Sequence, residues 1–307
     1  MKSGFFFLAG MADAQTAELV LTADGVITNI VFAEELVNAA PPITGWMFTA
    51  LKPALDIKNV SITMANYSFT AENLFFYADD IPDCPDEIDI KVIHADFNEA
   101  DENTIINGSL IFLDNFLGEL NFVTTIDAIA VIGKEQAEKE LIPIEKLKPY
   151  LIWREKEFVE KYGDLQYNPA NDSFAALEAK LSNGAPMLAI INIGLLGWEG
   201  KASHPWILDV EIKYNGENNN GMPDNETYRL LDDIEDDILA QLNDADAYLN
   251  IGRQTADNAR EIYIACNDFR KSSKVMYALK QKYAGLLNLG YKVYKDKYWR
   301  SFNRFVN

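Results

Sequence analysis

Alternating apolar and polar residues predict short strands along the first 134 residues, and two segments have helical spacing instead. One helix is predicted at Asn29–Ala39, where Pro41 and Pro42 end the pattern. The other, mostly buried, is predicted at Thr104–Leu117 with Gly118 as its C-cap. Strands are predicted at Gly45–Leu51, Ile62–Met64, Tyr67–Thr70, Asn73–Tyr77, Glu87–His94 and Thr124–Ile132.

The N-terminus allows two interpretations. Lys2, a short apolar run and an A-x-A-like Ala12-Asp-Ala before Gln15 imitate a secretion signal. However, Ala17–Thr22 continues as a second extended segment. We therefore favour a hairpin whose arms, Gly4–Met11 and Ala17–Thr22, are joined around Ala12–Gln15.

The second half begins with a hairpin around Asn183-Gly184, a dipeptide typical of tight turns between strands. An amphipathic helix follows at Thr227–Leu242. Its apolar stripe predicts that five acids face away from the core: Asp232, Asp233, Glu235, Asp236 and Asp237. A second helix is predicted at Ser272–Ala284. The remaining strands are predicted at Pro205–Tyr214, Ala247–Gly252, Arg260–Cys266 and Tyr291–Tyr294, with Gln254–Ala259 joining the middle two.

This order of elements predicts an α+β protein with two ferredoxin-like (βαββαβ-type) units, each with extra strands. The sheets should be mainly antiparallel, with helices on one face. The length of 307 residues also fits about two domains. We place an N-terminal domain at residues 1–134, a charged helical connector at 135–166 and a C-terminal domain at 167–307.

The chain is strongly acidic, with 47 Asp and Glu against 27 Lys and Arg and a net charge of −20. This balance argues against nucleic-acid binding and favours a basic protein partner. No apolar run approaches the length needed to span a bilayer, so no membrane partner is expected. Cys84 and Cys266 lie far apart without metal or redox spacing, which suits a reducing cytoplasm.

Positive charge is concentrated at the C-terminal end. Residues 269–307 hold ten Lys or Arg and one acid, Asp296, so this segment is +9 and the rest of the chain is −29. The segment 224–246, with nine acids and one arginine, belongs to the same domain. We expect the basic segment to pair with it, although a patch for anions or nucleic acid with Tyr294 and Trp299 stacking, or an assembly surface built from the same aromatics, remains open.

Arg253 and Arg260 suggest a ligand site. Arg253 is expected to end one strand and Arg260 to begin the next, so the two guanidinium groups could meet at one end of a sheet. Together with Thr255 and Tyr263 they could bind a carboxylate or phosphate, a task that suits the planar guanidinium. The alternative is that both arginines pair with nearby acids, either Asp257 and Glu261 or the acidic helix.

Other chemistry is not indicated. His94 and His204 each lie at a strand end and are expected to be structural. The glycine-rich segment Gly194–Gly200 lacks the lysine and helix of a phosphate loop, and the acid clusters lack the spacing of calcium loops. We therefore expect neither a metal nor a cofactor.

From about Ser173 onward, the chain resembles a bacterial family of unknown function, numbered 695. The resembling segments are His204-Pro-Trp206, Gly221-Met-Pro-Asp224, Asp232-Asp-Ile-Glu-Asp236, Gly252-Arg-Gln-Thr255 and Arg260-Glu-Ile-Tyr263. The N-terminal half, with Gly45-Trp46 and Leu113–Glu119, resembles the region that precedes this domain in proteins of Bacteroidetes-type bacteria. There a helical segment commonly lies further upstream, which suggests a truncated start here. The resemblance implies no catalytic activity. By association it implies similarity to the regulator of ribonuclease activity B, an acidic protein that binds a basic segment of an enzyme.

Two functions follow from these observations. One is a non-enzymatic interaction or regulatory protein that binds a basic protein segment through acidic surfaces. The other is a small-anion-binding protein or enzyme that uses Arg253 and Arg260. The oligomeric state and the presence of catalysis stay open at this point.

Overall fold

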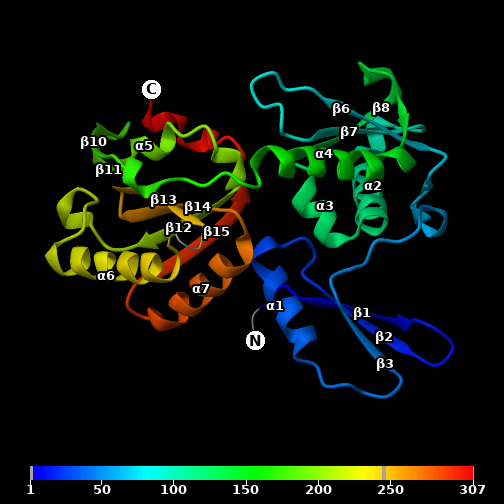
Figure 1. Cartoon of the computed structure of the whole chain (residues 1–307), viewed down its shortest axis with the longest axis horizontal. Coiled ribbons are helices and arrows are strands. Elements are labelled where there is room, and N and C mark those ends of the chain that lie inside the picture. The colour runs from blue at the N-terminus through cyan, green and yellow to red at the C-terminus, as the bar shows by residue number, and fades with distance from the viewer. Residues whose placement is uncertain (1–2, 244–246, 307) are drawn as a thin grey trace. The chain divides into compact units, whose positions relative to one another are not determined.

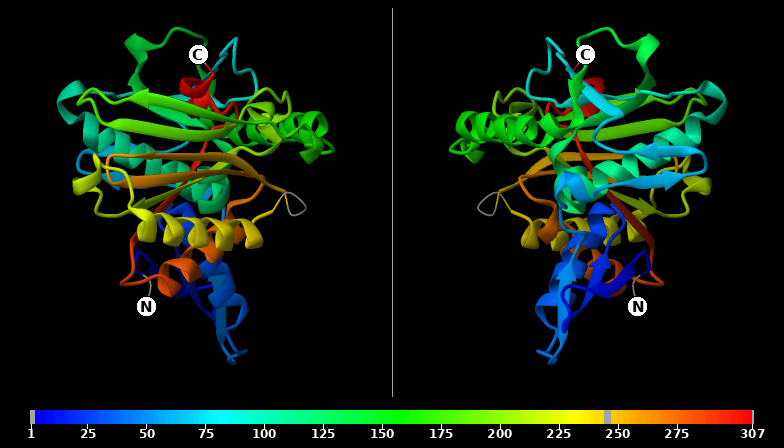
Figure 2. Two further views of the ribbon diagram at one scale, coloured as in Figure 1. Left: turned by 90° about the vertical axis from the view of Figure 1, so that its left-hand side faces the viewer. Right: turned by 90° about the vertical axis from the view of Figure 1, so that its right-hand side faces the viewer.

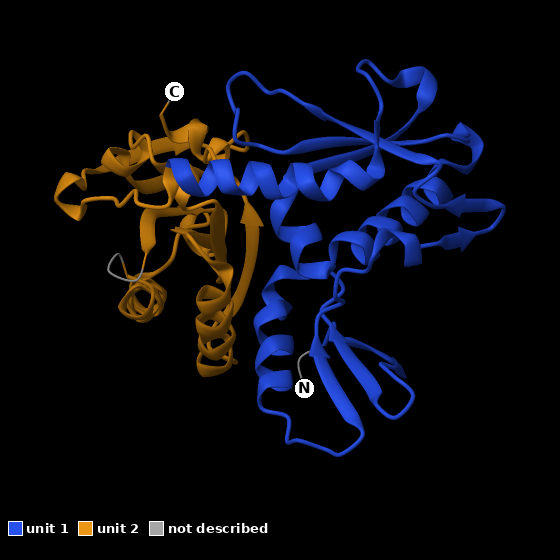
Figure 3. Ribbon diagram, turned by 45° about the vertical axis from the view of Figure 1, so that its right-hand side comes forward, with its two compact units in different colours: residues 1–161 blue, residues 162–307 orange. Residues whose placement is uncertain are grey.

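The chain forms two compact units, residues 1–161 and 162–307 (Figure 3). The structure, a computed structural model, describes residues 3–243 and 247–306. Both units combine helices with mainly antiparallel sheets, which confirms the predicted α+β class.

Unit 1 divides its strands among three sheets (Figure 1). Their orders are β1-β2-β3, β4-β5 and β8-β7-β6-β9, and two parallel pairs, β2–β3 and β7–β8, are joined by helices. The ferredoxin-like unit with extra strands that was predicted for this half is not confirmed, because the strands are divided among these sheets. The elements are β1 (Phe6–Met11), β2 (Ala17–Thr22), α1 (Ile27–Asn38), β3 (Trp46–Ala50), β4 (Ile62–Met64), β5 (Tyr67–Phe69), β6 (Leu74–Asp79), β7 (Asp89–His94), α2 (Glu102–Leu117), α3 (Glu119–Thr125), β8 (Ala128–Gly133), β9 (Ile142–Pro143) and α4 (Leu147–Tyr162).

The N-terminal hairpin is confirmed. β1 and β2 pair antiparallel from Phe6 opposite Thr22 to Met11 opposite Ala17. The turn between them is closed by Asp13, whose carboxylate accepts hydrogen bonds from the backbone N–H groups of Gln15 and Thr16 at 2.8 and 2.9 Å. A side chain that satisfies turn donors in this way explains why the chain reverses at this point.

The core of unit 1 lies between α2 and the β6–β7 strands. Phe112 and Leu113 of α2 belong to the same buried cluster as Phe76 and Ile90, and the first turns of α4 add Leu147. The segment after α2 differs from the prediction, because residues 119–125 form helix α3 and the strand begins only at Ala128. Gly118, with a positive φ of 81°, ends α2 and redirects the chain into α3.

Unit 2 is built on one six-stranded antiparallel sheet in the order β10-β11-β13-β14-β12-β15. The sequence order β12-α6-β13-β14-α7-β15 and this strand order are consistent with the predicted ferredoxin-like unit, to which β10 and β11 are added at one edge. The elements are β10 (Phe174–Lys180), β11 (Pro186–Asn192), α5 (Ile193–Leu196), β12 (Trp206–Lys213), α6 (Asn225–Gln241), β13 (Tyr248–Ala256), β14 (Ala259–Cys266), α7 (Phe269–Lys282), β15 (Asn288–Lys295) and η9 (Arg300–Phe305).

The two faces of this sheet are covered by different elements. Helices α6 and α7 lie on one face, and the C-terminal segment with η9 lies on the other (Figures 1 and 2). Trp299 and Phe302 are each only 1% exposed and pack in one cluster with Ile207 and Ala265. Because these aromatic side chains fill the unit's own core, Trp299 is not available for the stacking or assembly surface considered from the sequence.

The turn between β13 and β14 is tighter than predicted. Both strands extend to the two-residue turn Asp257-Asn258, where φ is 46° and 66°. Two consecutive positive φ values are typical of a type I′ hairpin turn, and Asp and Asn tolerate them well. Arg253 therefore lies within β13, opposite Ile262, and Thr255 lies opposite Arg260.

Candidate functional site

Arg253, Thr255 and Arg260 come together on the helix-covered face of the unit 2 sheet, facing α6. Side chains alternate between the two faces of a strand, and the register of β13 with β14 places these three on the same side. A bulge between Asn250 and Gly252 sets this phase. Gly252 has a φ of 134°, and a Cβ atom there would lie 2.2 Å from the carbonyl oxygen of Ile190, so the position before Arg253 requires glycine.

Arg260 is the centre of the cluster. Its side chain is 1% exposed, and its Nη1 donates to Asp232 Oδ1 at 2.7 Å and to Glu235 Oε2 at 3.4 Å. Its Nε donates to Thr255 Oγ1 at 3.3 Å. The guanidinium also lies over the Tyr228 ring, 4.9 Å from the ring centroid. A buried cation is tolerated because carboxylates and an aromatic face replace the lost water.

Arg253 is partly exposed and pairs with the same two acids. Its Nη1 donates to Glu235 Oε2 at 2.6 Å and lies 3.8 Å from Asp232 Oδ1. Burial is the largest influence on the pKa of Arg253 and would lower it, but the charge and hydrogen bond of Glu235, together with Asp232 and Tyr228, outweigh burial, so the pKa is raised. Glu235 therefore bridges both guanidinium groups, and the two arginines and two carboxylates form a cluster without net charge.

The acidic helix supplies these partners from the side that was predicted to face solvent. Glu235 is 8% exposed and lies among the buried residues of α6, and Asp232 also points toward the arginines. The prediction that both acids face away from the core was therefore wrong. The face of α6 that packs on the sheet can include two carboxylates because the facing strands carry two cations that pair with them. Of the two interpretations of the arginines, the geometry corresponds to pairing with acids of the helix.

Tyr263, the fourth candidate, lies on the opposite face of the sheet. It packs against the Phe302 ring at a centroid distance of 5.1 Å, within the cluster that includes the C-terminal aromatics. Its hydroxyl donates to Glu261 Oε2 at 2.8 Å and accepts from Arg304 Nη2 at 2.9 Å. The structure therefore brings together three of the four predicted residues and separates Tyr263 from them.

Comparison with protein families places this cluster in a recognised domain. Residues 180–306 match the model of DUF695, a family of unknown function. The match covers less than half of the chain and includes all residues of the arginine cluster. No curated protein and no solved structure matches the chain. The resemblance inferred from the C-terminal motifs is confirmed for this region.

A second polar group lies in the DUF695 region on the sheet face opposite α6, and sequence reasoning missed it. Asp209 of β12 is 7% exposed and pairs with Lys292 of β15 at 3.0 Å, and Glu261 accepts from Gln254 Nε2 at 2.9 Å. Burial raises the pKa of Asp209, while Lys292 opposes that shift. An acid in the otherwise apolar run Trp206–Val210 was the signal available in the sequence, because a buried carboxylate needs a nearby cation.

A surface hollow of about 720 Å³ in the DUF695 region lies near the start of β15. Lys213, Lys280 and Asn288 contribute to its lining, together with Leu286 and Leu289. Neither Arg253 nor Arg260 lines it. The arginine cluster is therefore part of the packed interface between α6 and the sheet rather than the wall of this hollow.

His94 in unit 1 has two hydrogen bonds within the fold. Its ring is fully buried, its Nδ1 accepts from the backbone N–H of Asp96 at 3.1 Å, and its Nε2 lies 3.0 Å from the carbonyl oxygen of Ser68. An Nδ1 that accepts leaves the proton on Nε2, where it is donated to Ser68, so the neutral tautomer satisfies both contacts. This is a structural role.

His204 in the DUF695 region is buried against the Trp198 ring at a centroid distance of 5.7 Å. Its Nδ1 lies 2.8 Å from Ser203 Oγ, but its Nε2 has no protein hydrogen-bond partner among the described residues. Burial lowers its pKa to about 4 from the usual value of 6.5.

This shift predicts a pH-dependent stability. The unfolded chain binds the proton near pH 6.5 and the folded chain only near pH 4, so the stability from neutral His204 is complete above pH 6.5 and declines below it. Between pH 7.5 and 5.0, a range above the sequence pI of about 4.5, the loss should be about 2 kcal/mol. Urea unfolding at several pH values, for wild type and His204→Gln, measures it. Parallel pH curves for the two proteins would contradict the shift.

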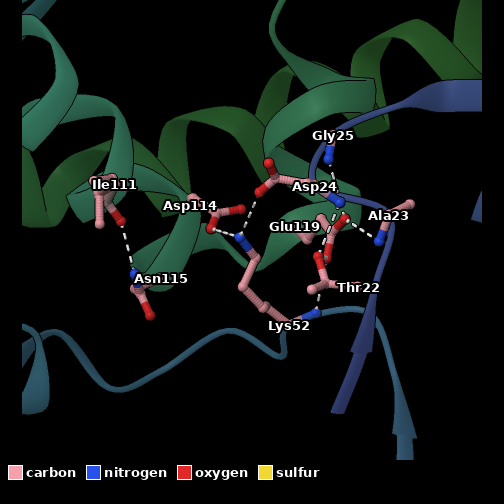
Figure 4. Close-up of polar contacts among 9 residues, drawn as sticks. All are labelled: Thr22, Ala23, Asp24, Gly25, Lys52, Ile111, Asp114, Asn115 and Glu119. Carbon is pink, nitrogen blue, oxygen red and sulfur yellow. Dashed lines mark hydrogen bonds and ion pairs between the residues drawn. The ribbon is translucent and has the colours of Figure 1, made fainter. Parts of the chain in front are cut away.

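Unit 1 has a separate buried polar cluster around Glu119 (Figure 4). Glu119 is fully buried, and its Oε1 accepts from the backbone N–H groups of Ala23 and Gly25 at 3.0 and 3.1 Å. Its Oε2 accepts from Thr22 Oγ1 at 2.6 Å and from the Lys52 N–H at 3.1 Å. All four partners are donors, so Glu119 connects the end of β2 and the segment after β3 to α3.

In residues 3–243 and 247–306, no group of three or more His, Cys, Asp or Glu side chains is placed to hold a metal ion. Over the same residues, no helix combines the length and apolar character that crossing a bilayer requires. Cys84 and Cys266 are both buried and are not joined in a disulfide, and burial raises the pKa of Cys266 to about 12, which disfavours its reactive thiolate.

Proposed function

We propose that the protein is a non-enzymatic interaction or regulatory protein that binds a basic protein segment through acidic surfaces, including the outward face of α6. The observation that carries this proposal is that some acids of α6 pair with arginines of the sheet while others are exposed. Asp232 and Glu235 neutralise the two arginines of the sheet, whereas Glu226, Asp233 and Asp236 are exposed. None of these three exposed acids has an ion-pair partner among the described residues.

The net charge of −20 supports the same proposal. A negative field attracts a basic segment over a distance comparable to the Debye length, so association should be fast and sensitive to salt. Asp237, also on α6, pairs with Lys282 of α7, so part of the basic C-terminal segment is already satisfied inside unit 2. The exposed acids of α6 then remain available to an external cation.

The alternative is an anion site at Arg253 and Arg260. An anion there would have to compete with Asp232 and Glu235, which lie 2.7 and 2.6 Å from the guanidinium nitrogens. Displacing these carboxylates from a buried arginine costs free energy, because the acids lose their partners. The anion would have to bind the arginines strongly enough to offset that cost. We therefore favour the acidic-surface proposal.

The test uses a lysine- and arginine-rich peptide and measures its affinity at several salt concentrations. The variant Glu226→Gln, Asp233→Asn, Asp236→Asn should weaken binding at low salt by about tenfold, since each exposed charge contributes about 0.5 kcal/mol. The matched control is Glu135→Gln, Glu138→Gln, Glu140→Gln, which removes the same charge from exposed positions of unit 1. Equal losses in both variants, or binding that is indifferent to salt, would refute the role of α6.

A further inference from the structure

The chain contains four Asn-Gly pairs, which begin at Asn107, Asn183, Asn215 and Asn220. None of them takes part in the function proposed above. Glycine has no Cβ, so its backbone nitrogen can approach the side-chain amide of the preceding asparagine with little steric hindrance. Attack by that nitrogen makes asparagine one of the thermolabile residues. The fold decides which of the four pairs has the freedom to react.

The Asn183-Gly184 pair lies at the tip of the β10–β11 hairpin. The backbone N–H of Leu181 donates to the Ala185 carbonyl at 2.9 Å, and that of Gly184 donates to the Leu181 carbonyl at 2.8 Å. Gly184 has a φ of 84°, as in hairpin loops that end in a glycine bulge. Asn183 and Gly184 are both exposed. Apart from the two chain neighbours, no atom of the described residues lies within 4 Å of a Cβ placed on Gly184, so this turn can open without disturbing another segment.

The glycines of the other three pairs are packed against further parts of the fold. Gly108 lies inside α2, where a Cβ atom would be 2.1 Å from the Phe69 ring. The N–H of Gly216 donates to Asn258 Oδ1 at 2.9 Å, in the turn between β13 and β14. Gly221 is buried, and its carbonyl accepts from the Asn258 N–H at 2.9 Å. Turning any of these three glycines toward its asparagine therefore requires a larger local opening than at Gly184.

The side chain of Asn183 is also held in a contact that favours attack. Its Oδ1 accepts a hydrogen bond from the Ala185 N–H at 2.9 Å. A donor on this oxygen draws electron density away from Cγ and stabilises the negative charge that develops on the oxygen when a nucleophile adds. Asn215 has a similar contact with the Glu217 N–H, at 3.1 Å. The freedom of the glycine, rather than this contact, therefore distinguishes Asn183 from Asn215.

We propose that Asn183 is a site of spontaneous deamidation, with the Gly184 backbone nitrogen as the nucleophile. This nitrogen loses its proton to solvent and bonds to Cγ of Asn183, and the side-chain nitrogen leaves as ammonia, so that a succinimide ring forms. Water then opens one of the two ring carbonyls and yields either an aspartyl or an isoaspartyl linkage. In sum, water is consumed, ammonia is released and a carboxylate is gained.

The reaction changes the hairpin in two ways. Either product adds a negative charge at the tip. The isoaspartyl product also moves the side-chain methylene of residue 183 into the backbone, which is incompatible with the short hydrogen bonds between Leu181 and its partners in the turn. Strand β10 is at the edge of its sheet and pairs there with β11 alone, so the pairing of β10 should weaken. This proposal does not rest on the proposed function, because it involves none of the α6 acids.

Incubation of the native full-length chain in ¹⁸O-labelled water at mildly alkaline pH, followed by peptide mass spectrometry, tests the proposal. Incorporated ¹⁸O marks each residue that has passed through a succinimide. Asn183 should react at least about tenfold faster than Asn107, Asn215 and Asn220, because its turn opens at a lower cost. In concentrated urea the four rates should agree to within about threefold, because the fold no longer separates the pairs. Native rates that are no faster at Asn183, or an equally large advantage of Asn183 in urea, would overturn the proposal.

Variants separate the chemistry from its structural consequence. Asn183→Gln keeps the amide but requires a larger, slower-forming ring, so conversion at this position should be lost. Asn215→Gln, in another exposed Asn-Gly turn, is the matched control and should leave the rate at Asn183 unchanged. Hydrogen exchange of the β10 amides should be faster in the isoaspartyl protein than in Asn183→Asp, which gains the same charge without the additional backbone atom. Persistent conversion in Asn183→Gln contradicts the assigned site, and equal exchange in the last two proteins contradicts the weakened pairing of β10.

Discussion

Replacing Arg260 with methionine should lower the free energy of unfolding by about 4 kcal/mol, because it removes one member of a buried ion-pair cluster. Arg260 donates to Asp232, Glu235 and Thr255 from a position that is 1% exposed. Without Arg260, Asp232 keeps only a distant contact with Arg253, at 3.8 Å. Glu235 then has Arg253 as its cation and shares it with Asp232. Urea unfolding monitored by circular dichroism measures the loss.

Arg229→Met is the matched control for this variant. Arg229 lies on the exposed face of α6, so its replacement should change stability by less than about 0.5 kcal/mol. A double-mutant cycle with Asp232→Asn separates the pair from general packing, since two residues in contact should couple by about 1–3 kcal/mol. If Arg260→Met is no less stable than Arg229→Met, the cluster is not what holds α6 to the sheet.

The pattern of apolar residues predicted most elements of both units because each buried face repeats with the period of its element. β12 was also recognised as a strand, although Trp206–Val210 is buried on both faces and does not alternate there. The same reasoning found α6 and α7 and the β10–β11 hairpin. Local periodicity carries this information without any knowledge of the partners.

Contacts between distant residues could not be predicted in the same way. The division of unit 1 into separate sheets depends on which strands pair, and the parallel β2–β3 and β7–β8 pairs follow helical crossovers that leave no local signal. The Asp257-Asn258 turn was missed because the strand pattern was ended too early, at Gly252, where a bulge changes the phase. Arg253 was therefore placed at a strand end rather than within β13.

The candidate site was predicted only in part. Strand alternation places some of its residues, and contacts between distant residues place the others. Arg253, Thr255 and Arg260 share a face because β13 and β14 are neighbours in sequence and in space. Tyr263 is an odd number of residues from Arg260 on the same strand, so alternation alone sends it to the other face. The inward orientation of Glu235 depends on the cations opposite it, which the helical pattern of α6 does not contain.

Glu119→Gln should also cost about 4 kcal/mol of unfolding free energy, although it changes only one atom. Both carboxylate oxygens accept two hydrogen bonds, and every partner is a donor. An amide NH₂ in place of either oxygen would face two donors in a fully buried site, and the charge that strengthens the remaining bonds would be lost.

Denaturant unfolding measures this cost, and hydrogen exchange at the Ala23, Gly25 and Lys52 amides shows where it arises. Exchange at these three amides should accelerate more than at the β6–β7 core, because they lose their acceptor directly. Glu135→Gln, at an exposed position of unit 1, is the control and should change neither measurement. A Glu119→Gln protein within about 1 kcal/mol of wild type, with unchanged exchange at Ala23 and Gly25, would show that the connection between β2 and α3 does not depend on this carboxylate.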